Sequence, residues 1–282
     1  MEKIKIHVLH TGKVCIAPSL AFGGEHCNLL KASGIFCKKS ERIWLPVSVY
    51  LIEHPKGNIL VDCGWHRSLS PEGIYDKKAQ IRSLRSPLLY LINQGVLPEG
   101  QAVDEQLRKM NLSTNDIDYV LLTHLDCDHA NGLAQVAGAK HILAAEEEIR
   151  FANKHSLVRY QKKWWKNVPL TAFRWNGTEG PASKSYDLFG DGSVVLIHIP
   201  GHSDGLFAVK IRNANGKFVL LCSDGGYAQK SWTEMITSGI SSDKKMQRSS
   251  LAWIRSENAN PDCIRCFANH DPDVEPQVIE LS

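Results

Sequence analysis

The amino-acid sequence predicts a layered α/β fold, and three features of the chain predict it. Short apolar runs bounded by turn residues recur along the sequence, segments with helical spacing lie between them, and several of the apolar runs end directly in His or Asp. Mixed strands and helices of this kind pack as layers around one core. The 282 residues suffice for one large domain, and we expect a single domain over 1–282.

The N-terminal half begins with an alternation of charged and apolar residues, which is typical of a half-buried strand. Two later apolar runs flank a turn at 55–58 and therefore predict a hairpin. Helical spacing follows, and Ser113 or Thr114 is a candidate cap for a short turn before the next strand. The elements expected in this half are strands at 1–8, 47–52, 59–61 and 119–122 and a helix at 101–110.

The C-terminal half repeats this alternation of apolar runs and helical segments. Its expected elements are strands at 194–199, 206–211, 218–221 and 263–267 and helices at 146–153 and 246–257. Two stretches, 18–46 and 66–100, fit no regular pattern, although 87–92 is an apolar run. Long irregular stretches in compact domains are often functional, so we expect loops that form a substrate pocket, with Leu88, Leu89, Leu91 and Ile92 as candidate wall residues. A helix that packs in the core is the alternative for these four residues, because short apolar runs are ambiguous.

Composition narrows the possible partners. The net charge is only +3 and no long Lys/Arg run occurs, which argues against nucleic acid as a partner. No segment has the apolar length of a signal peptide or a membrane span. The 8 cysteines show no disulfide-scaffold spacing, which predicts reduced thiols and a cytoplasmic protein. Cys263 and Cys266 lie three apart in an expected strand, so they should face opposite sides and not form a zinc ribbon.

The most informative segment is Thr-His-Leu-Asp-Cys-Asp-His at 123–129, which follows an apolar strand directly. It offers His124, Asp126, Asp128 and His129 as metal ligands on a loop that a strand end supports. Imidazole nitrogen and carboxylate oxygen are the usual donors for zinc, manganese and iron. A polar surface loop is the alternative, but this density of donors argues against it.

Three further donors stand in similar positions. His202, Asp224 and His270 each follow an apolar run by a few residues. A fold that gathers strand ends at one edge would bring all of these side chains together. The sequence therefore predicts a metal centre at that edge.

With these residues in place, the sequence resembles the metallo-β-lactamase superfamily, whose hallmark is His-x-His-x-Asp-His followed by distant His, Asp and His. Within it, the sequence is most similar to the N-acyl homoserine lactonase family. The similarity covers nearly the whole chain. It includes Leu45-Pro46-Val47, Ile59-Leu60-Val61-Asp62-Cys63-Gly64, Ile117-Asp118-Tyr119-Val120, His129-Ala130-Asn131-Gly132, Pro200-Gly201-His202-Ser203 and Ser223-Asp224-Gly225-Gly226-Tyr227.

The resemblance implies an αβ/βα four-layer sandwich with two divalent ions at one edge. It also implies that Tyr227 contacts the substrate carbonyl and that Asp62 orients a metal-bound histidine without binding metal itself. The implied ligands are His124, Asp126 and His202 for the first ion, Asp128, His129 and His270 for the second, and Asp224 between them.

One position departs from the family pattern, because Asp126 stands where the family has its second histidine. A carboxylate is a harder and shorter donor than imidazole. Either Asp126 ligates and shifts the preference from zinc towards manganese or iron, or it falls short and weakens the first ion. Superfamily members with iron-containing sites tolerate a carboxylate here.

The resemblance implies hydrolysis of an N-acyl homoserine lactone or a related lactone by a hydroxide that bridges the two ions. Tyr227 and a metal would stabilise the oxyanion, and Asp128 could pass a proton to the leaving alkoxide. Hydrolysis of a thioester, a β-lactam or a phosphodiester is an alternative. So are oxygen chemistry at iron and a metal-binding regulatory protein without turnover. The acyl-chain length and the oligomeric state stay open.

Overall fold

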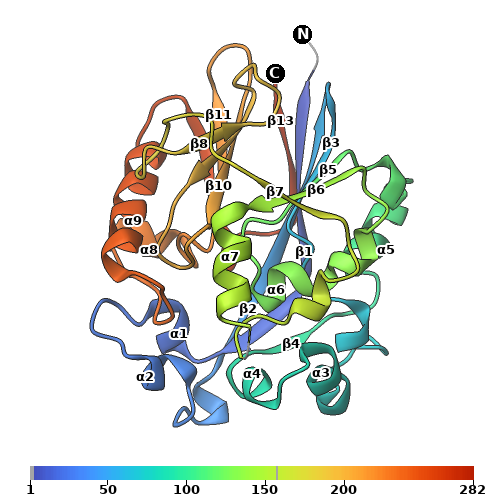
Figure 1. The fold of residues 1–282 in the computed structure, drawn as a ribbon, viewed down its shortest axis with the longest axis vertical. Helices are drawn as coiled ribbons and strands as arrows, with labels where there is room; N and C mark the ends of the chain where they lie inside the picture. The colour runs from blue at the N-terminus through green and yellow to red at the C-terminus, as the bar shows by residue number, and fades with distance from the viewer. Residues whose placement is uncertain (1–2, 157) are drawn as a thin grey trace.

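A computed structural model of the chain describes residues 3–156 and 158–282. Met1 and Glu2 of the first expected strand lie outside the described residues. Two β-sheets lie face to face at the centre of the molecule, and helices cover their outer faces (Figure 1). This is the αβ/βα sandwich that the family resemblance implied.

The larger sheet has eight strands in the order β13-β1-β2-β3-β5-β6-β7, with β4 paired to β1. Its strands are β1 (Ile4–Ile16), β2 (Ile43–His54), β3 (Gly57–Val61), β4 (Gln94–Val96), β5 (Tyr119–Leu121), β6 (His141–Ala145), β7 (Leu170–Phe173) and β13 (Gln277–Leu281). The smaller sheet has five strands in the order β12-β11-β10-β9-β8. They are β8 (Ser185–Asp187), β9 (Val194–His198), β10 (Phe207–Arg212), β11 (Phe218–Ser223) and β12 (Cys263–Ala268).

Figure 1 shows α8 and α9 beside the smaller sheet and α5 and α7 beside the larger one. The α-helices are α1 (Pro18–Phe22), α2 (Leu29–Ser33), α3 (Lys77–Leu84), α4 (Pro87–Ile92), α5 (Val103–Lys109), α6 (Cys127–Ala130), α7 (Glu146–Lys154), α8 (Gln229–Thr233) and α9 (Lys244–Asn258). Short 3₁₀ turns occupy Lys39–Glu41, Arg67–Leu69, Thr114–Asp116, Asn131–Val136 and Lys162–Trp164.

Three apolar clusters hold these layers together. The cluster between the sheets joins Ile6 of the larger sheet to Leu196 and Phe207 of the smaller one. The other two pack each sheet against its own helices, as where Leu251 and Ile254 of α9 lie against the smaller sheet. The central strands are buried on both faces, which explains why their sequences are apolar without interruption.

Parallel pairing decides where the functional loops meet. β5 lies between β3 and β6 and is parallel to both, and β11 is parallel to β12. The carboxyl ends of parallel strands meet at the same edge of a sheet. The loops after β3 and β5 in one sheet and after β11 and β12 in the other carry Asp62, His124, Asp224 and His270.

The expectation that 18–46 and 66–100 are irregular loops was wrong in part. The first segment holds α1, α2 and the start of β2, and the second holds α3, α4 and β4. These helices are too short to show periodicity, but their ends carry local signals. Proline occupies the first turn of α1 and α4, and the Asp76 side chain accepts hydrogen bonds from the first turn of α3.

The expectation that Cys263 and Cys266 face opposite sides of their strand was also wrong. Their sulfur atoms lie 3.7 Å apart and therefore on the same side of β12. The pairing of β11 with β12 shifts between Phe218 and Val219, where Cys263 and Arg265 are the successive partners. This irregularity adds one residue to the strand and so reverses the alternation of its faces. Neither cysteine belongs to a potential metal-binding group among the described residues.

Candidate metal centre

The His-Asp segment forms a turn between β5 and α6. Asp126 precedes the first residue of α6, and Asp128 and His129 lie within that helix. The buried Asp62 carboxylate anchors the turn, because it accepts hydrogen bonds from the Thr123 amide at 2.9 Å and the Thr123 hydroxyl at 2.8 Å. The Thr123 hydroxyl also lies 2.7 Å from the Ser223 hydroxyl, which ties the motif to the strand end that precedes Asp224.

Each of the four histidines predicted to bind metal has a neighbour at its Nδ1 atom. The Nδ1 distances are 3.1 Å to Thr123 Oγ1 for His124, 2.8 Å to Asp62 Oδ2 for His129, 3.5 Å to Ser238 Oγ for His202 and 2.7 Å to the Pro46 carbonyl for His270. Neighbours of this kind fix the ring orientation and leave the other nitrogen for a metal. The contact to Asp62 is the one that the family resemblance implied.

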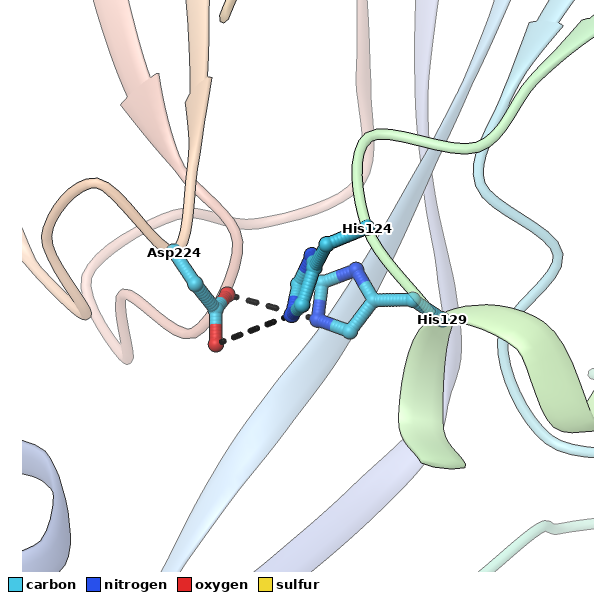
Figure 2. Close-up of side chains that lie close together, drawn as sticks. All are labelled: His124, His129 and Asp224. Atoms are coloured by element: carbon cyan, nitrogen blue, oxygen red, sulfur yellow. Dashed lines mark ion pairs between the residues drawn. The ribbon is translucent and has the colours of Figure 1, made fainter. Parts of the chain in front are cut away.

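Asp224 faces His124 and His129 (Figure 2) and also lies close to His202 and His270. Its Oδ1 atom is 3.3 Å from the Nε2 atoms of both His129 and His270. Its Oδ2 atom is 3.9 Å from His124 Nε2 and 3.6 Å from His202 Nε2. One carboxylate therefore offers a separate oxygen to each pair, which is the geometry that a bridging ligand requires.

The other two aspartates complete the two groups. Asp126 Oδ2 lies 3.4 Å from His124 Nε2 and 3.0 Å from His202 Nε2. Asp128 Oδ2 lies 3.4 Å from His270 Nε2. The donor atoms of His124, Asp126 and His202, here called the first half-site, lie within 4.8 Å of one another, and so do those of Asp128, His129 and His270, here called the second half-site.

The residues fit a divalent metal centre, because several of their buried polar atoms lack a hydrogen-bond partner in the described part of the chain. His124 Nε2, Asp224 Oδ1 and His270 Nε2 are buried and have no hydrogen-bond partner of good geometry among the described residues. Orphaned buried polar atoms are costly and rare. Burial alone would raise the pKa of Asp224, but His270 and His129 outweigh it and hold that pKa well below its ordinary value. The centre therefore presents an ionised carboxylate among inward-facing imidazoles, which a cation would stabilise.

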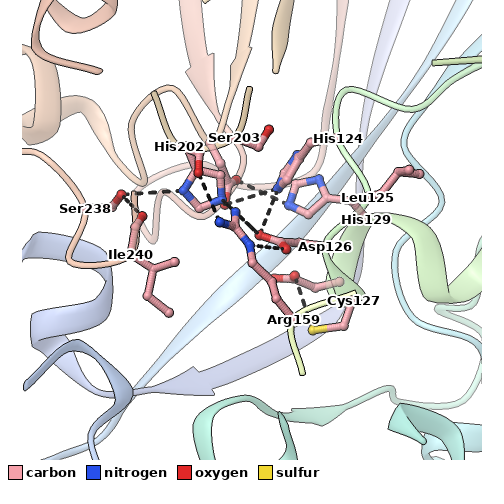
Figure 3. Close-up of polar contacts among 12 residues, drawn as sticks. His124, Leu125, Asp126, Cys127, His129, Arg159, His202, Ser203, Ser238 and Ile240 are labelled. Carbon is pink, nitrogen blue, oxygen red and sulfur yellow. Dashed lines mark hydrogen bonds and ion pairs between the residues drawn. The ribbon is translucent and has the colours of Figure 1, made fainter. Parts of the chain in front are cut away.

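Asp126 has a partner that the sequence analysis missed. The Arg159 guanidinium donates two hydrogen bonds to the Asp126 carboxylate, from Nε to Oδ1 and from Nη2 to Oδ2, both of 2.7 Å (Figure 3). Burial raises the pKa of Asp126, yet Arg159 and the nearby histidines lower it well below its usual range. A buried carboxylate in place of a histidine calls for a cation, but nothing in the sequence indicates which of the arginines supplies it.

Tyr227 is buried beside the second half-site. Its ring stacks on the His270 ring with 4.9 Å between centroids. Among the described residues, the Tyr227 hydroxyl has no hydrogen-bond partner. Burial, together with Asp224 and Asp128, raises the pKa of Tyr227 well above its ordinary value, so the phenol remains a proton donor at neutral pH.

A cavity of about 450 Å³ opens onto these groups. At one end it is lined by Asp126, Asp128, Arg159, His202 and Tyr227. Its remaining wall is mostly apolar. The two segments that the sequence analysis singled out contribute Leu20, Leu29, Leu30, Ile35, Leu88, Leu89 and Ile92, and other parts of the chain contribute Val14, Ile16, Val158 and Ile240. Leu91 does not line this cavity, and half of its surface is exposed.

A family model described as the metallo-beta-lactamase superfamily matches residues 42–227, which contain six of the donor residues described above. The chain belongs to the metallo-β-lactamase superfamily. This confirms the family resemblance and the fold that it implied. His270 lies beyond the matched range, and the fold brings it to within 3.3 Å of Asp224.

Relatives within the superfamily include lactonases. The N-acyl homoserine lactonase AttM of Rhizobium radiobacter is 25% identical over 238 residues, which is 81% of this chain and 83% of the relative. A probable metallo-hydrolase of Mycobacterium tuberculosis is 28% identical over 211 residues, which is 72% of this chain and 61% of the relative. These similarities cover most of the chain at low identity.

Solved structures share the superfamily fold. A structure of an N-acyl homoserine lactone hydrolase with the product N-hexanoyl-L-homoserine at its catalytic metal centre matches with a TM-score of 0.73 and 20% identity, over 96% of this chain and 94% of the other. A probable metal-dependent hydrolase from Staphylococcus aureus matches with a TM-score of 0.67. No helix among the described residues combines the length and the apolar character needed to cross a membrane.

Proposed function

We propose that the chain is a metal-dependent lactonase that opens the ring of an N-acyl homoserine lactone or a related small lactone. The observation that carries the proposal is the position of the metal centre at the polar end of a largely apolar cavity, beside the unpartnered hydroxyl of Tyr227. An amphiphilic substrate fits such a cavity, with its acyl chain on the apolar wall and its ring at the donors. The names of the lactonase relatives support the same substrate class.

Two divalent ions held by the two half-sites would supply an activated water at neutral pH and a Lewis acid for the ring carbonyl. Asp224 would bind both ions through its separate oxygens. Zinc, manganese and iron are all compatible with these donors. The ring of His270, fixed by the Pro46 carbonyl, would present Nε2 and position Tyr227 through their stacking.

Two side chains would act on the substrate itself. The Tyr227 hydroxyl, kept protonated by burial and neighbouring carboxylates, would donate a hydrogen bond to the developing oxyanion. Asp128 lines the cavity, so its carboxylate would carry a proton to the alkoxide that leaves when the ring opens. The product would be the ring-opened hydroxy acid.

The alternatives have less support. A phosphodiester substrate would favour a cavity with several free cations, whereas this cavity is mainly apolar and its Arg159 is paired with Asp126. The case for oxygen chemistry at iron rested on the carboxylate at position 126, and Arg159 now gives that carboxylate another partner. Thioester and β-lactam hydrolysis use the same groups and are separated only by assay.

We also propose a cytoplasmic location. All 8 cysteines are free thiols in the structure, including the neighbouring Cys263 and Cys266. Unpaired thiols at such a short distance are compatible with a reducing compartment.

The test is a comparison of substrates with fully metal-loaded protein. N-acyl homoserine lactones of short, medium and long acyl chains are compared with a thioester, a β-lactam and a phosphodiester by following acid release or product mass. Tyr227→Phe should lower kcat for the lactone by roughly a hundredfold and leave KM nearly unchanged, because one oxyanion donor is lost. Tyr119→Phe, which alters a phenol at the start of β5, is the matched control and should behave as wild type.

Hydrolysis of lactones with the expected loss in Tyr227→Phe supports the proposal. A metal-loaded enzyme that cleaves thioesters or phosphodiesters well and no lactone of any chain length refutes it. Tyr227→Phe with wild-type kcat would withdraw the role given to that hydroxyl.

A further inference from the structure

The Arg159 guanidinium lies among the donor atoms of the first half-site (Figure 3). Its Nη2 atom is 2.7 Å from Asp126 Oδ2 and 2.9 Å from His202 Nε2, so one nitrogen contacts two of the three donors. Its Nη1 atom donates to the His202 main-chain oxygen at 3.1 Å. A positive group therefore already touches the atoms that would bind the first ion.

Two groups approach the His202 Nε2 atom, Arg159 Nη2 at 2.9 Å and Asp126 Oδ2 at 3.0 Å. Arginine has donors only, so its hydrogen bond to Nε2 uses the lone pair of that nitrogen, whereas a hydrogen bond to Asp126 would use a proton there. The lone pair of a neutral imidazole is also what binds a metal. Arg159 and an ion thus require the same electrons on His202 and the same oxygen on Asp126.

The two half-sites differ in this respect. In the first, only His124 Nε2 is left without a hydrogen-bond partner. In the second, His270 Nε2 and the facing Asp224 Oδ1 are both left without one, and no arginine or lysine makes a hydrogen bond to Asp128, His129 or His270 among the described residues. In the second half-site a neutral amide, Asn269 Nδ2, lies 3.5 Å from His129 Nε2, whereas in the first a charged guanidinium contacts two donors at 2.7 and 2.9 Å.

The position of Arg159 allows exchange. Its side chain is 19% exposed, and Arg159 lines the cavity as well as the half-site. It also lies over the Tyr160 ring, 5.1 Å from the centroid, which gives the cation a second favourable contact. Displacement from Asp126 requires movement of one side chain at the cavity wall.

We propose that Arg159 is a built-in cation that competes with the first ion for Asp126 and His202. The inference rests on the metal centre of the proposed function. The two ions then bind unequally, with the second half-site filled first and the first half-site filled only when the guanidinium is displaced. Removing the guanidinium should tighten the binding of one ion and leave the other nearly unchanged.

The test is a calorimetric titration of the metal-free full-length protein with Mn²⁺, and separately with Zn²⁺. Wild type should show two steps, with the weaker ion bound at least about tenfold less tightly than the other. Arg159→Met keeps the aliphatic length and removes the charge, and it should tighten the weaker step by roughly tenfold or more. The matched control is Arg150→Met, an exposed arginine of α7, which should titrate as wild type.

Two equal steps in wild type, or a folded Arg159→Met with the wild-type isotherm, would overturn the inference. If Arg159→Met does not fold because Asp126 is left without its partner, the double variant Asp126→His with Arg159→Met removes both charges together. It should bind two ions with nearly equal affinity, and unequal binding there would count against the competition. The titration contains no substrate, so a failed lactone assay leaves this result standing, and equal ion affinities leave the lactone assay standing.

Discussion

The two half-sites of the candidate metal centre are built from similar donors but are held in different ways. In the second, His129 is fixed by the Asp62 carboxylate and His270 by the Pro46 carbonyl, and their Nε2 atoms face Asp224. In the first, Asp126 and His202 are held by Arg159. In the second half-site these contacts are made at Nδ1, away from the Nε2 atoms that would bind an ion. In the first, Arg159 contacts the donor atoms themselves.

The carboxylate at position 126 therefore affects both the stability of the fold and the affinity of the first half-site for an ion. A buried carboxylate at position 126 without a partner would be strongly destabilising, and breaking such a buried pair typically costs about 3–5 kcal/mol. Arg159 removes that cost in the metal-free protein. The same contact makes the first half-site harder for an ion to enter, so stability without metal and affinity for metal are opposed there.

The largest effect is expected from Asp224→Ala, because Asp224 is the residue that both half-sites share. The variant should bind neither ion tightly and should lose activity by on the order of a thousandfold or more. Elemental analysis after dialysis, together with the lactone assay, measures both losses. Retention of two tightly held ions would mean that Asp224 does not bridge.

The next effect separates the half-sites by one substitution in each. His270→Ala should abolish the tight ion and with it nearly all activity, since the second half-site is filled first. His202→Ala should keep one tight ion and lose the weaker one. Ion counts at limiting and at excess metal distinguish the two variants. Loss of the same ion in both variants would show that the half-sites are equivalent.

A smaller effect concerns the choice of metal. The carboxylate of Asp126 is a harder donor than imidazole, so wild type should be more active with Mn²⁺ or Fe²⁺ than with Zn²⁺. In Asp126→His this preference should shrink or reverse. Activities at saturating concentrations of each metal check the expectation, and an identical order of metals in both proteins would show that Asp126 does not influence the first ion.

The smallest effect is expected on the stability of the fold, and it comes from Glu148 of α7. Its carboxylate accepts hydrogen bonds from the Leu125 amide at 3.0 Å and the Ser203 hydroxyl at 2.6 Å, so it ties together the loops that carry His124 and His202. Burial raises the pKa of Glu148 from 4.5 to about 7. Because the folded-state pKa is raised, the protonated form stabilises the fold, and this contribution is lost as the pH rises from about 4.5 to about 7.

Glu148→Gln should therefore gain stability relative to wild type over that pH interval. Urea unfolding of the metal-free proteins at several pH values measures the difference in the free energy of unfolding. A difference that stays constant with pH would mean that Glu148 does not titrate in this interval.

Much of the fold followed from local sequence pattern. The strands β9 to β12 and the helices α5, α7 and α9 are close to their expected ranges, because apolar runs and helical spacing are strong signals. The family and the αβ/βα sandwich are confirmed. The helices α1 to α3 were missed, because α1 and α2 have only five residues each and the mostly polar sequence of α3 shows no clear apolar stripe. The structure bears out the helix that was the alternative for the apolar run at 87–92.

The sequence predicted those site residues whose side chains are typical metal ligands. The expected metal ligands lie within contact distance of one another, although their binding of ions is still a prediction. Arg159 could not be found in this way, because it follows α7 in a stretch with no motif and reaches Asp126 only through the tertiary fold. Charge balance at Asp126 indicates that a cation is needed but not where it lies in the chain.

The most direct test of the unequal metal centre is anomalous diffraction from crystals of the full-length protein soaked in Mn²⁺, first at limiting and then at excess concentration. At limiting concentration, one peak should lie between Asp128, His129, His270 and Asp224, with Arg159 still on Asp126. At excess, a second peak should lie between His124, Asp126 and His202, with the guanidinium moved away. A first peak at His124 and His202, or two peaks with Arg159 unmoved, would contradict the account.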